Sequence, residues 1–254
     1  MRTDTSAGRG SAAVRTVLEA SLDEARARGI EQPKVVDVGG GSGGWAVPFA
    51  SAGCLVTVVE PNPNALATLR RRAEEGGVAE RITVVADDSE ALHQHVPADS
   101  ADLVLAHGLF EVVDDPSATA TALARVLAPG GTVSVLVANR HAAVLQRALA
   151  GRLTTARQLL ASPEGVLSED GETLLRRLDT ARLAELLVGA GLEITLLQGD
   201  GVVPDTAQPA AHPTDTEAGT WESELAEFEA LAANTPPLRD IAGRLHALAT
   251  RPRG

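Results

Sequence analysis

Apolar segments alternate with helical segments along the first half of the chain. Five segments are rich in Val, Ile and Leu with little polar alternation, as expected of parallel strands that are covered on both faces: residues 34–38, 55–60, 81–86, 101–107 and 132–138. Helical patterns separate several of them, over residues 64–77 and 117–127 for example. The alternation predicts an α/β fold, a doubly wound and mainly parallel sheet with helices on both faces.

The chain on either side of this region is less regular. A polar start, residues 1–9, is expected to be loose, and residues 11–28 show a helical period. The second half predicts several further segments: irregular helix over 141–178, a helix over 179–191 that leads into a sixth strand, a long loop over 200–220, an amphipathic helix over 221–233 and a last strand over 244–250.

Composition narrows the functional classes. The net charge is −12 and the pI is near 4.9, which disfavours a nucleic-acid partner because phosphates would be repelled. Aromatic residues make up 2% of the chain, so the core must be aliphatic. The N-terminus has no apolar signal region and no apolar run is long enough to span a membrane. We therefore expect a cytoplasmic protein with no membrane contact.

The single cysteine, Cys54, excludes an internal disulfide and a cysteine-based metal cluster. It lies at the start of the second strand, between Gly53 and Leu55. We interpret it as a small core residue rather than a reactive thiol.

The glycine-rich segment 35–45, VVDVGGGSGGW, fits three enzyme signatures. It contains G-x-G-x-x-G, the dinucleotide fingerprint, and G-x-S-x-G around Ser42, the nucleophile elbow of hydrolases. It also contains an acidic residue, Asp37, followed by x-G-x-G-x-G, as in proteins that bind S-adenosylmethionine (SAM). The surrounding chain must distinguish the three.

Asp37 favours the SAM signature. A hydrolase elbow usually lies deeper in the sheet than the first strand. The dinucleotide signature is supported by Glu60, which ends the second strand where ribose recognition requires an acid. However, a carboxylate at position 37 would lie close to a pyrophosphate and repel it. SAM carries no phosphate, and its ammonium group can be oriented by Asp37 directly or through water.

Five segments in register resemble the class I (Rossmann-like) SAM-dependent methyltransferases. They are VVDVGGGSG, VTVVEPNPNAL, ITVVADDSEAL, ADLVLAHGLFEVVDDP and RVLAPGGTVSVLVAN, within residues 35–139. The resemblance implies SAM as the cofactor and an antiparallel last strand. It also implies one methyltransferase domain over 1–254, with an N-terminal helix in 1–30, a SAM-binding core in 31–140 and a C-terminal part in 141–254 that adds a helical cap, a long loop and the last strands.

A narrower resemblance extends over most of the chain. The segments LVLAHGLFEVVDDP, VANRHAAVLQRALAG and LAEFEALAANTPPLRDIAGRLHALATRP resemble bacterial methyltransferases that esterify carboxymethoxyuridine in tRNA. After the sixth strand that family carries a basic and aromatic element, whereas this chain has Val203-Pro204-Asp205. We therefore carry over the cofactor site and not the tRNA substrate.

The cofactor-binding candidates follow from position and resemblance. Gly39, Gly40, Gly41 and Gly43 would let the backbone approach the methionine moiety and the ribose. Glu60 would accept hydrogen bonds from the ribose hydroxyls, and Asp88 with Ser89 would contact the adenine, although Asp87 competes for that role. The resemblance implies that Arg15 grips the SAM carboxylate and that His107 touches SAM.

No residue is assigned as catalytic and no metal site is expected. His93 and His95 are two residues apart on a predicted loop with no third ligand evident. The expected activity is methyl transfer from SAM to an unidentified acceptor, a carboxylate or a small-molecule O or N nucleophile. The alternatives are a tRNA carboxymethoxyuridine methyltransferase, a non-catalytic SAM-binding protein and a nicotinamide-dependent oxidoreductase.

Overall fold

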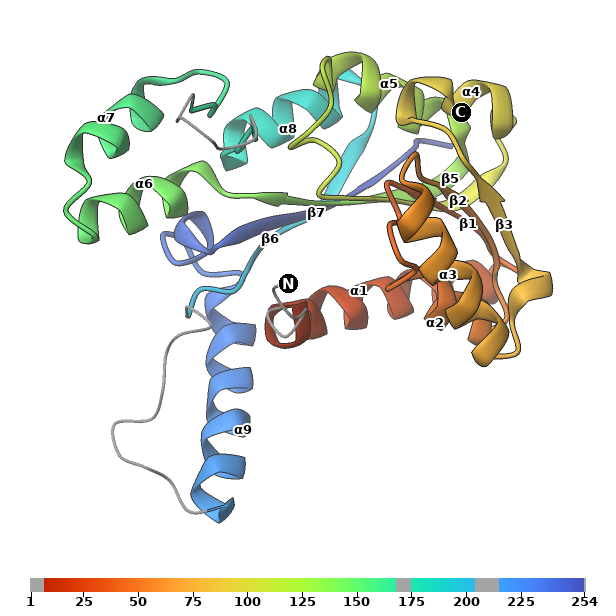
Figure 1. Cartoon of the computed structure of the whole chain (residues 1–254), viewed down its shortest axis with the longest axis horizontal. Helices are drawn as coiled ribbons and strands as arrows, with labels where there is room; N and C mark the ends of the chain where they lie inside the picture. The colour runs from red at the N-terminus through yellow and green to blue at the C-terminus, as the bar shows by residue number, and fades with distance from the viewer. Residues whose placement is uncertain (1–6, 168–174, 204–214, 254) are drawn as a thin grey trace. The chain divides into compact units, whose positions relative to one another are not determined.

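A computed structural model describes residues 7–167, 175–203 and 215–253 (Figure 1). Its contacts separate the chain into two compact units. Unit 1 comprises Met1–Val17, Ala138–Thr180 and Leu197–His246, and unit 2 comprises Leu18–Val137, Ala181–Leu196 and Ala247–Gly254. The assignment of one methyltransferase domain to residues 1–254 stays a prediction.

Seven strands form one sheet in the order β3-β2-β1-β4-β5-β7-β6, with β7 antiparallel. This confirms the predicted doubly wound, mainly parallel sheet and the antiparallel last strand. The strands are β1 Lys34–Val38, β2 Leu55–Val59, β3 Ile82–Val85, β4 Ala101–His107, β5 Leu127–Ala138, β6 Glu193–Asp200 and β7 Arg244–Thr250.

The register of the parallel strands brings four chain segments to one edge of unit 2. Asp37 of β1 pairs with Val58 of β2 and Leu105 of β4, and Val59 pairs with Val85 of β3. The segments that follow β1, β2, β3 and β4 therefore leave the sheet at the same edge. Because β1 lies between β2 and β4, the strand order reverses there, and such a switch point is where open α/β sheets bind ligands.

Helices lie on both sides of these strands. In Figure 1, α2 and α3 lie on one side of β1–β3, and α4 and α5 lie on the other. Side-chain caps start two of these helices, since Asn62 accepts from the Asn64 N–H at 2.9 Å and Asp115 from the Ser117 N–H at 2.8 Å. The α-helices are α1 Ala7–Ala27, α2 Ala46–Ser51, α3 Pro63–Glu75, α4 Leu92–His95, α5 Pro116–Val126, α6 Arg140–Leu149, α7 Leu153–Ala161, α8 Thr180–Gly189 and α9 Asp215–Ala232, and the short 3-10 helices are η1 Ala79–Arg81, η2 Ser89–Ala91 and η3 Arg239–Ile241.

The fifth strand is longer than the sequence predicted. It begins at Leu127 rather than at residue 132, so the Pro-Gly-Gly turn signal at 129–131 lies inside the strand. The reason is pairing with the chain end, because the Gly130 N–H donates to the Arg251 carbonyl at 2.9 Å and the Arg251 N–H donates to the Gly131 carbonyl at 2.9 Å. Pairing with Arg251, which is distant in sequence, therefore keeps residues 129–131 in the strand although their local sequence is typical of a turn.

Three further expectations were wrong at element boundaries. α1 begins at Ala7, inside the segment expected to be loose, and α9 begins at Asp215, inside the expected loop 200–220, whose residues 204–214 lie outside the described part of the chain. His93 and His95 lie on the short helix α4 and not on a loop. Asp88 starts the 3-10 helix η2, which leads into α4, by accepting from the Glu90 N–H, a local cap that helical periodicity cannot reveal in so short a segment.

The core is aliphatic, as the composition predicted. Leucine supplies most of the largest fully buried side chains, with Phe110 the one aromatic side chain among them. Cys54 is buried, which confirms its interpretation as a core residue. Among the described helices, none has the length and apolar character needed to cross a membrane.

Unit 1 is held by buried polar groups as well as by apolar contacts. The Asn139 side-chain amide donates to the carbonyls of Asp240 and Ala242, at 2.9 and 2.8 Å. Arg140 forms an ion pair with Asp179, and Glu229 of α9 accepts from the Val202 and Val203 N–H groups. These bonds connect segments that are distant in sequence.

Candidate functional site

The glycine loop that joins β1 to α2 follows a path that only glycine can take. Gly39, Gly41 and Gly43 have φ values of 72°, 55° and 81°, in the left-handed region. A Cβ at Gly40 would lie 2.6 Å from Asp37 Cγ. The loop is therefore wrapped tightly around the end of β1.

Asp37, near the end of β1, has a buried carboxylate, one oxygen of which lacks a hydrogen-bond donor among the described residues. The residue is 2% exposed, and within the described part of the chain no group donates a hydrogen bond to its Oδ2. Burial, with a smaller contribution from the charge of Glu60, raises the pKa of Asp37 to about 7. Such a carboxylate is suited to a ligand that brings a positive charge and N–H donors.

Glu60 follows β2 and holds the glycine loop. Its Oε2 accepts from the Gly41 N–H at 3.0 Å, and its Oε1 accepts from the Asn62 N–H at 2.8 Å. Each carboxylate oxygen has a second lone pair, so both can still accept from a ligand. Glu60 thus combines a positioning role with an open acceptor surface.

The segment after β3 separates the two competing aspartates. Asp88 Oδ1 accepts from the N–H groups of Glu90 and Ala91 at 2.9 and 3.3 Å. Asp87 Oδ2 is instead bonded to His95 Nε2 at 2.8 Å, and this hydrogen bond lowers the pKa of Asp87. Asp88 and Ser89 line the cavity described below, whereas Asp87 is not among its lining residues.

His107 ends β4 at the same edge. Its Nε2 lies 2.8 Å from Ser134 Oγ on β5, and its ring makes an edge-on contact with Trp45 at a centroid distance of 5.1 Å. Neither Ser134 nor Trp45 was singled out from the sequence. Only the pairing of β4 with β5 brings Ser134 to the imidazole.

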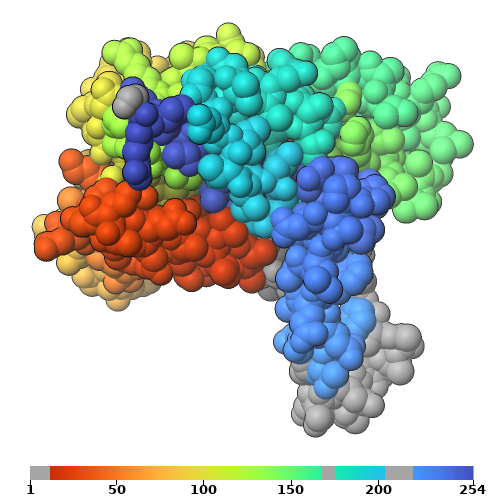
Figure 2. Space-filling view, turned by 180° about the vertical axis from the view of Figure 1, so that it is seen from behind, coloured from red at the N-terminus to blue at the C-terminus, as the bar shows by residue number. Residues whose placement is uncertain are grey.

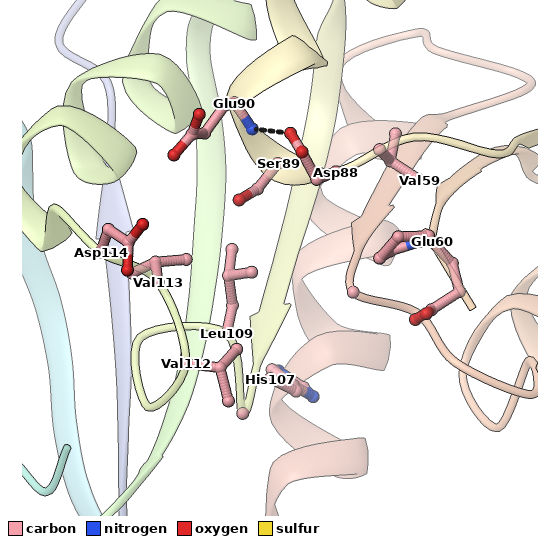
Figure 3. A pocket seen from close by; sticks show the side chains of 13 residues that line it. Val59, Glu60, Asp88, Ser89, Glu90, His107, Leu109, Val112, Val113 and Asp114 are labelled. Carbon is pink, nitrogen blue, oxygen red and sulfur yellow. Dashed lines mark hydrogen bonds between the residues drawn. The ribbon is translucent and has the colours of Figure 1, made fainter. Parts of the chain in front are cut away.

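These segments surround an open cavity of about 490 Å³ in unit 2 (Figure 3). Its charged lining is entirely acidic, with no Lys or Arg among the lining residues that the structure describes. Figure 3 shows Asp88, Ser89 and Glu90 on one side of Leu109 and the loop residues Val112, Val113 and Asp114 nearby. The lining residues are Gly39, Val59, Glu60, Pro61, Asp88, Ser89, Glu90, His107, Gly108, Leu109, Val112, Val113 and Asp114.

The structure therefore brings only some of the predicted site residues to the cavity. Gly39, Glu60, Asp88, Ser89 and His107 line the cavity, while Asp37, Gly40, Gly41 and Gly43 belong to the strand end and loop that contain Gly39 but are not among the lining residues. Arg15 is an exposed residue of α1 in unit 1 and is not among the lining residues. Sequence reasoning did not single out Glu90, Leu109 or the loop 112–114, although Leu109 and that loop lie within the segment ADLVLAHGLFEVVDDP that carried the family resemblance.

Ser42 is not arranged as a nucleophile. Its Oγ accepts a hydrogen bond from Arg72 Nη1 at 3.1 Å, and its carbonyl accepts from the same nitrogen at 3.2 Å. A nucleophile elbow requires a histidine base at the serine hydroxyl. Among the described residues, no group of three His, Cys, Asp or Glu side chains could hold a metal ion.

Sequence comparisons agree with the geometry. A family model described as a methyltransferase domain matches residues 36–135. The chain is 30% identical to the tRNA 5-carboxymethoxyuridine methyltransferase of Escherichia coli K12, over 53% of this chain and 52% of that protein. It is 32% identical to the ubiquinone biosynthesis O-methyltransferase of Thiobacillus denitrificans, over 65% of this chain and 67% of that protein. The chain spans about half the length of the tRNA methyltransferase.

Solved structures share the fold. A SAM-dependent methyltransferase from Mesorhizobium loti superposes with a TM-score of 0.59 at 21% identity, over 96% of this chain and all of that chain (100%). A second, described as a putative SAM-dependent methyltransferase from Listeria monocytogenes, gives 0.60 at 14% identity, over 87% of this chain and 90% of that chain. At these identities the likeness concerns the architecture.

The acidic side chains of the site fit SAM better than they fit a dinucleotide. A pyrophosphate would meet the carboxylates of Asp37 and Glu60 with no arginine or lysine in the described lining to offset the repulsion. SAM instead brings an ammonium and a sulfonium, and both are attracted to this lining.

Proposed function

This chain belongs to the class I SAM-dependent methyltransferases, and we propose that it transfers the sulfonium methyl group of SAM to a nucleophile on an acceptor molecule. SAM supplies an activated methyl group when bound, and S-adenosylhomocysteine is left after transfer. The residues of the chain bind and orient the two partners and exclude water. Placing an acceptor in line with the methyl group can contribute about 7–11 kcal/mol to lowering the barrier.

The observation that carries this proposal is the buried carboxylate of Asp37, two residues before Gly39, which lines the acidic cavity. Its Oδ2 lacks a hydrogen-bond donor among the described residues, and its pKa of about 7 reflects burial beside Glu60. An ammonium group at this position would supply the missing donor and favour the ionised carboxylate.

We assign the other contacts by position in the site. The backbone of Gly39, Gly40, Gly41 and Gly43 lies against the methionine moiety and the ribose, and Glu60 accepts from the ribose hydroxyls. Asp88 and Ser89 contact the adenine, and His107 contacts the cofactor near the transferred methyl group. Arg15 is assigned to the carboxylate of SAM on family resemblance.

The acceptor we favour is a small molecule with an O or N nucleophile, a carboxylate included, in the cytoplasm. The two named relatives act on a modified tRNA uridine and in ubiquinone biosynthesis, by their names. The net charge of −12 weakens the tRNA alternative, since phosphate contacts supply much of the affinity for RNA.

Calorimetry tests the cofactor assignment. The purified chain is titrated with SAM, S-adenosylhomocysteine and NADH, alongside Glu60→Ala and the control Gly44→Ala, whose added Cβ would meet nothing within 4 Å. We expect both SAM ligands to bind, NADH not to bind, and only Glu60→Ala to lose affinity. Folded protein that binds NADH and not SAM would support the oxidoreductase alternative instead.

The acceptor class is tested separately with SAM labelled at the methyl group. Transfer to bulk tRNA that falls steeply with salt would support the tRNA alternative. Transfer to a small-molecule extract, with none to tRNA, is the result we expect. SAM binding with no transfer to either would support a non-catalytic SAM-binding protein.

A further inference from the structure

A helical hairpin in unit 1 exposes an unusual number of leucines. α6 and α7 pack on each other through Ala143 and Leu159, which belong to one buried cluster with Leu167. Away from this cluster the hairpin, residues 140–161, presents four leucines to solvent. Leu145, Leu149, Leu153 and Leu160 are 41%, 80%, 66% and 55% exposed. Figure 2 shows residues of this segment, in green, at the surface of the molecule.

The spacing places these leucines on continuous helix faces. Leu145 and Leu149 are four residues apart on α6, and Leu153 and Leu160 are seven apart on α7, so each pair shares one face of its helix. Leu149 and Leu153 flank the tight turn, which is closed by a hydrogen bond of 2.8 Å from the Arg152 N–H to the Arg147 carbonyl. Exposed apolar side chains gathered in this way mark a contact surface rather than ordinary scatter.

The charge of the hairpin is opposite to that of the chain. No Asp or Glu occurs between Asp115 and Glu164, although the whole chain carries a net charge of −12. Arg140 forms an ion pair with Asp179, and Arg152 and Arg157 lie at the exposed surface of the hairpin. Arg157 lies four residues after Leu153 and three before Leu160, so it shares their helix face. The hairpin therefore combines exposed leucine with positive charge.

We propose that the α6–α7 hairpin docks on the surface of an anionic lipid bilayer. The leucines enter the boundary between headgroups and acyl chains, and the arginines contact the lipid phosphates, as in interfacial amphipathic helices. The expectation of no membrane contact relied on the lack of a long apolar run, which concerns spanning and not peripheral binding. The acidic remainder of the chain would be repelled by the same bilayer, so this hairpin is the surface that faces it.

RNA and a second copy of this chain are two other candidate partners, and each would explain only some features of this surface. RNA would explain the arginines, but it gains nothing from four exposed leucines, and the hairpin has no Phe, Tyr or Trp side chain on which a base could stack. A second copy related by a two-fold axis would cover the leucines, but it would bring the arginines of both copies together, where they repel.

Vesicle flotation of the full chain tests the proposal. Vesicles of phosphatidylcholine are compared with vesicles that also contain phosphatidylserine, at low and high salt. We expect binding to the anionic vesicles only, weakened by salt. The double variants Leu149→Glu/Leu153→Glu and Arg152→Gln/Arg157→Gln should each weaken it by about an order of magnitude or more.

A matched control separates this surface from general hydrophobicity. Leu231→Glu changes a leucine of α9 that is 73% exposed, outside the hairpin, and should leave vesicle binding unchanged. Each variant must retain the wild-type thermal transition. Equal binding to both vesicle types, or binding that survives both double variants, would overturn the proposal.

Two further outcomes would also overturn it in favour of another partner. One is tRNA binding that the arginine variant abolishes while vesicle binding is absent. The other is a dimer in sedimentation that the leucine variant dissociates, again without vesicle binding.

Discussion

Glu60 Oε2 accepts a hydrogen bond of 3.0 Å from the backbone N–H of Gly41, and this bond connects the end of β2 to the glycine loop after β1. The bond means that the acid assigned to the ribose also fixes the loop assigned to the methionine moiety. The two parts of the proposed cofactor site are thus positioned by one side chain. A change at Glu60 should affect both the acceptor for the ligand and the shape of the loop.

Glu60→Ala should weaken SAM binding by about a hundredfold or more, because hydrogen bonds that involve a charged group each contribute about 1.5–3 kcal/mol. Glu60→Gln keeps one carbonyl oxygen as an acceptor and should lose less affinity than the alanine variant. Calorimetric titration with SAM measures both. Equal affinities for the wild type and Glu60→Ala would remove Glu60 from the site.

Gly40→Ala should weaken SAM binding and destabilise the fold by about 1–3 kcal/mol, since the added Cβ has no room. It would lie 2.6 Å from Asp37 Cγ and 2.9 Å from Val58 Cγ1, and both neighbours are buried. Gly44→Ala is the matched control in the same loop, where the added Cβ meets no atom within 4 Å. Denaturant unfolding and calorimetry compare the two, and the assignment fails if both variants behave alike.

Patterns of apolar residues were sufficient for most of the fold. The first, fourth and last strands were predicted with the bounds that the structure shows, over 34–38, 101–107 and 244–250. Each is a short apolar run with polar or turn residues near its ends, so the local sequence contains the whole signal. The start of β5 was missed because its pairing partner, Arg251, is more than a hundred residues away in the chain.

The sequence indicated residues of the cavity lining where one residue type has one use. The acid after β2, Glu60, and the first glycine after β1, Gly39, both line the cavity, and they were singled out because ligand geometry restricts what can stand there. Their roles in binding stay predictions. The contact of His107 with Ser134, and the acids Glu90 and Asp114 in the cavity lining, depend on how separate segments meet. Residue identity alone does not distinguish such acids from the many acids of a solvated surface.

The contribution of Asp37 to the free energy of unfolding of the ligand-free protein should fall as the pH rises from about 4 to about 7. Its pKa is raised from 3.8 to about 7 in the folded chain, so the folded state holds a proton that the unfolded state has already lost in this interval. Above about pH 7 this effect levels off. Asp37→Asn should remove this contribution and raise the free energy of unfolding at pH 8 by roughly a few kcal/mol.

A rise in pH should have the opposite effect on the affinity for the cofactor. SAM binding should tighten as the pH rises through about 7, because the ionised Asp37 is the partner of the ammonium group, and Asp37→Asn should lose this dependence. Denaturant unfolding and calorimetry across pH measure the two effects. A variant that is more stable yet binds SAM as tightly as the wild type would contradict the assigned contact.

His246 should give the opposite dependence on pH. It is fully buried on β7, its Nδ1 lies 3.0 Å from the side-chain nitrogen of Gln198, and burial lowers its pKa from 6.5 to about 4. Between these values the unfolded state binds more protons, so stability should rise with pH, by at most about 1.4 kcal/mol per pH unit.

Because the contributions of Asp37 and His246 oppose each other over nearly the same interval, the wild type should show little net slope between about pH 4 and 6.5. The Asp37→Asn variant exposes the rise that His246 causes, and adding His246→Gln to it should flatten the curve again. Denaturant unfolding of the three proteins at several pH values measures these slopes. If Asp37→Asn still shows the shallow slope of the wild type, the two groups do not titrate as their burial requires.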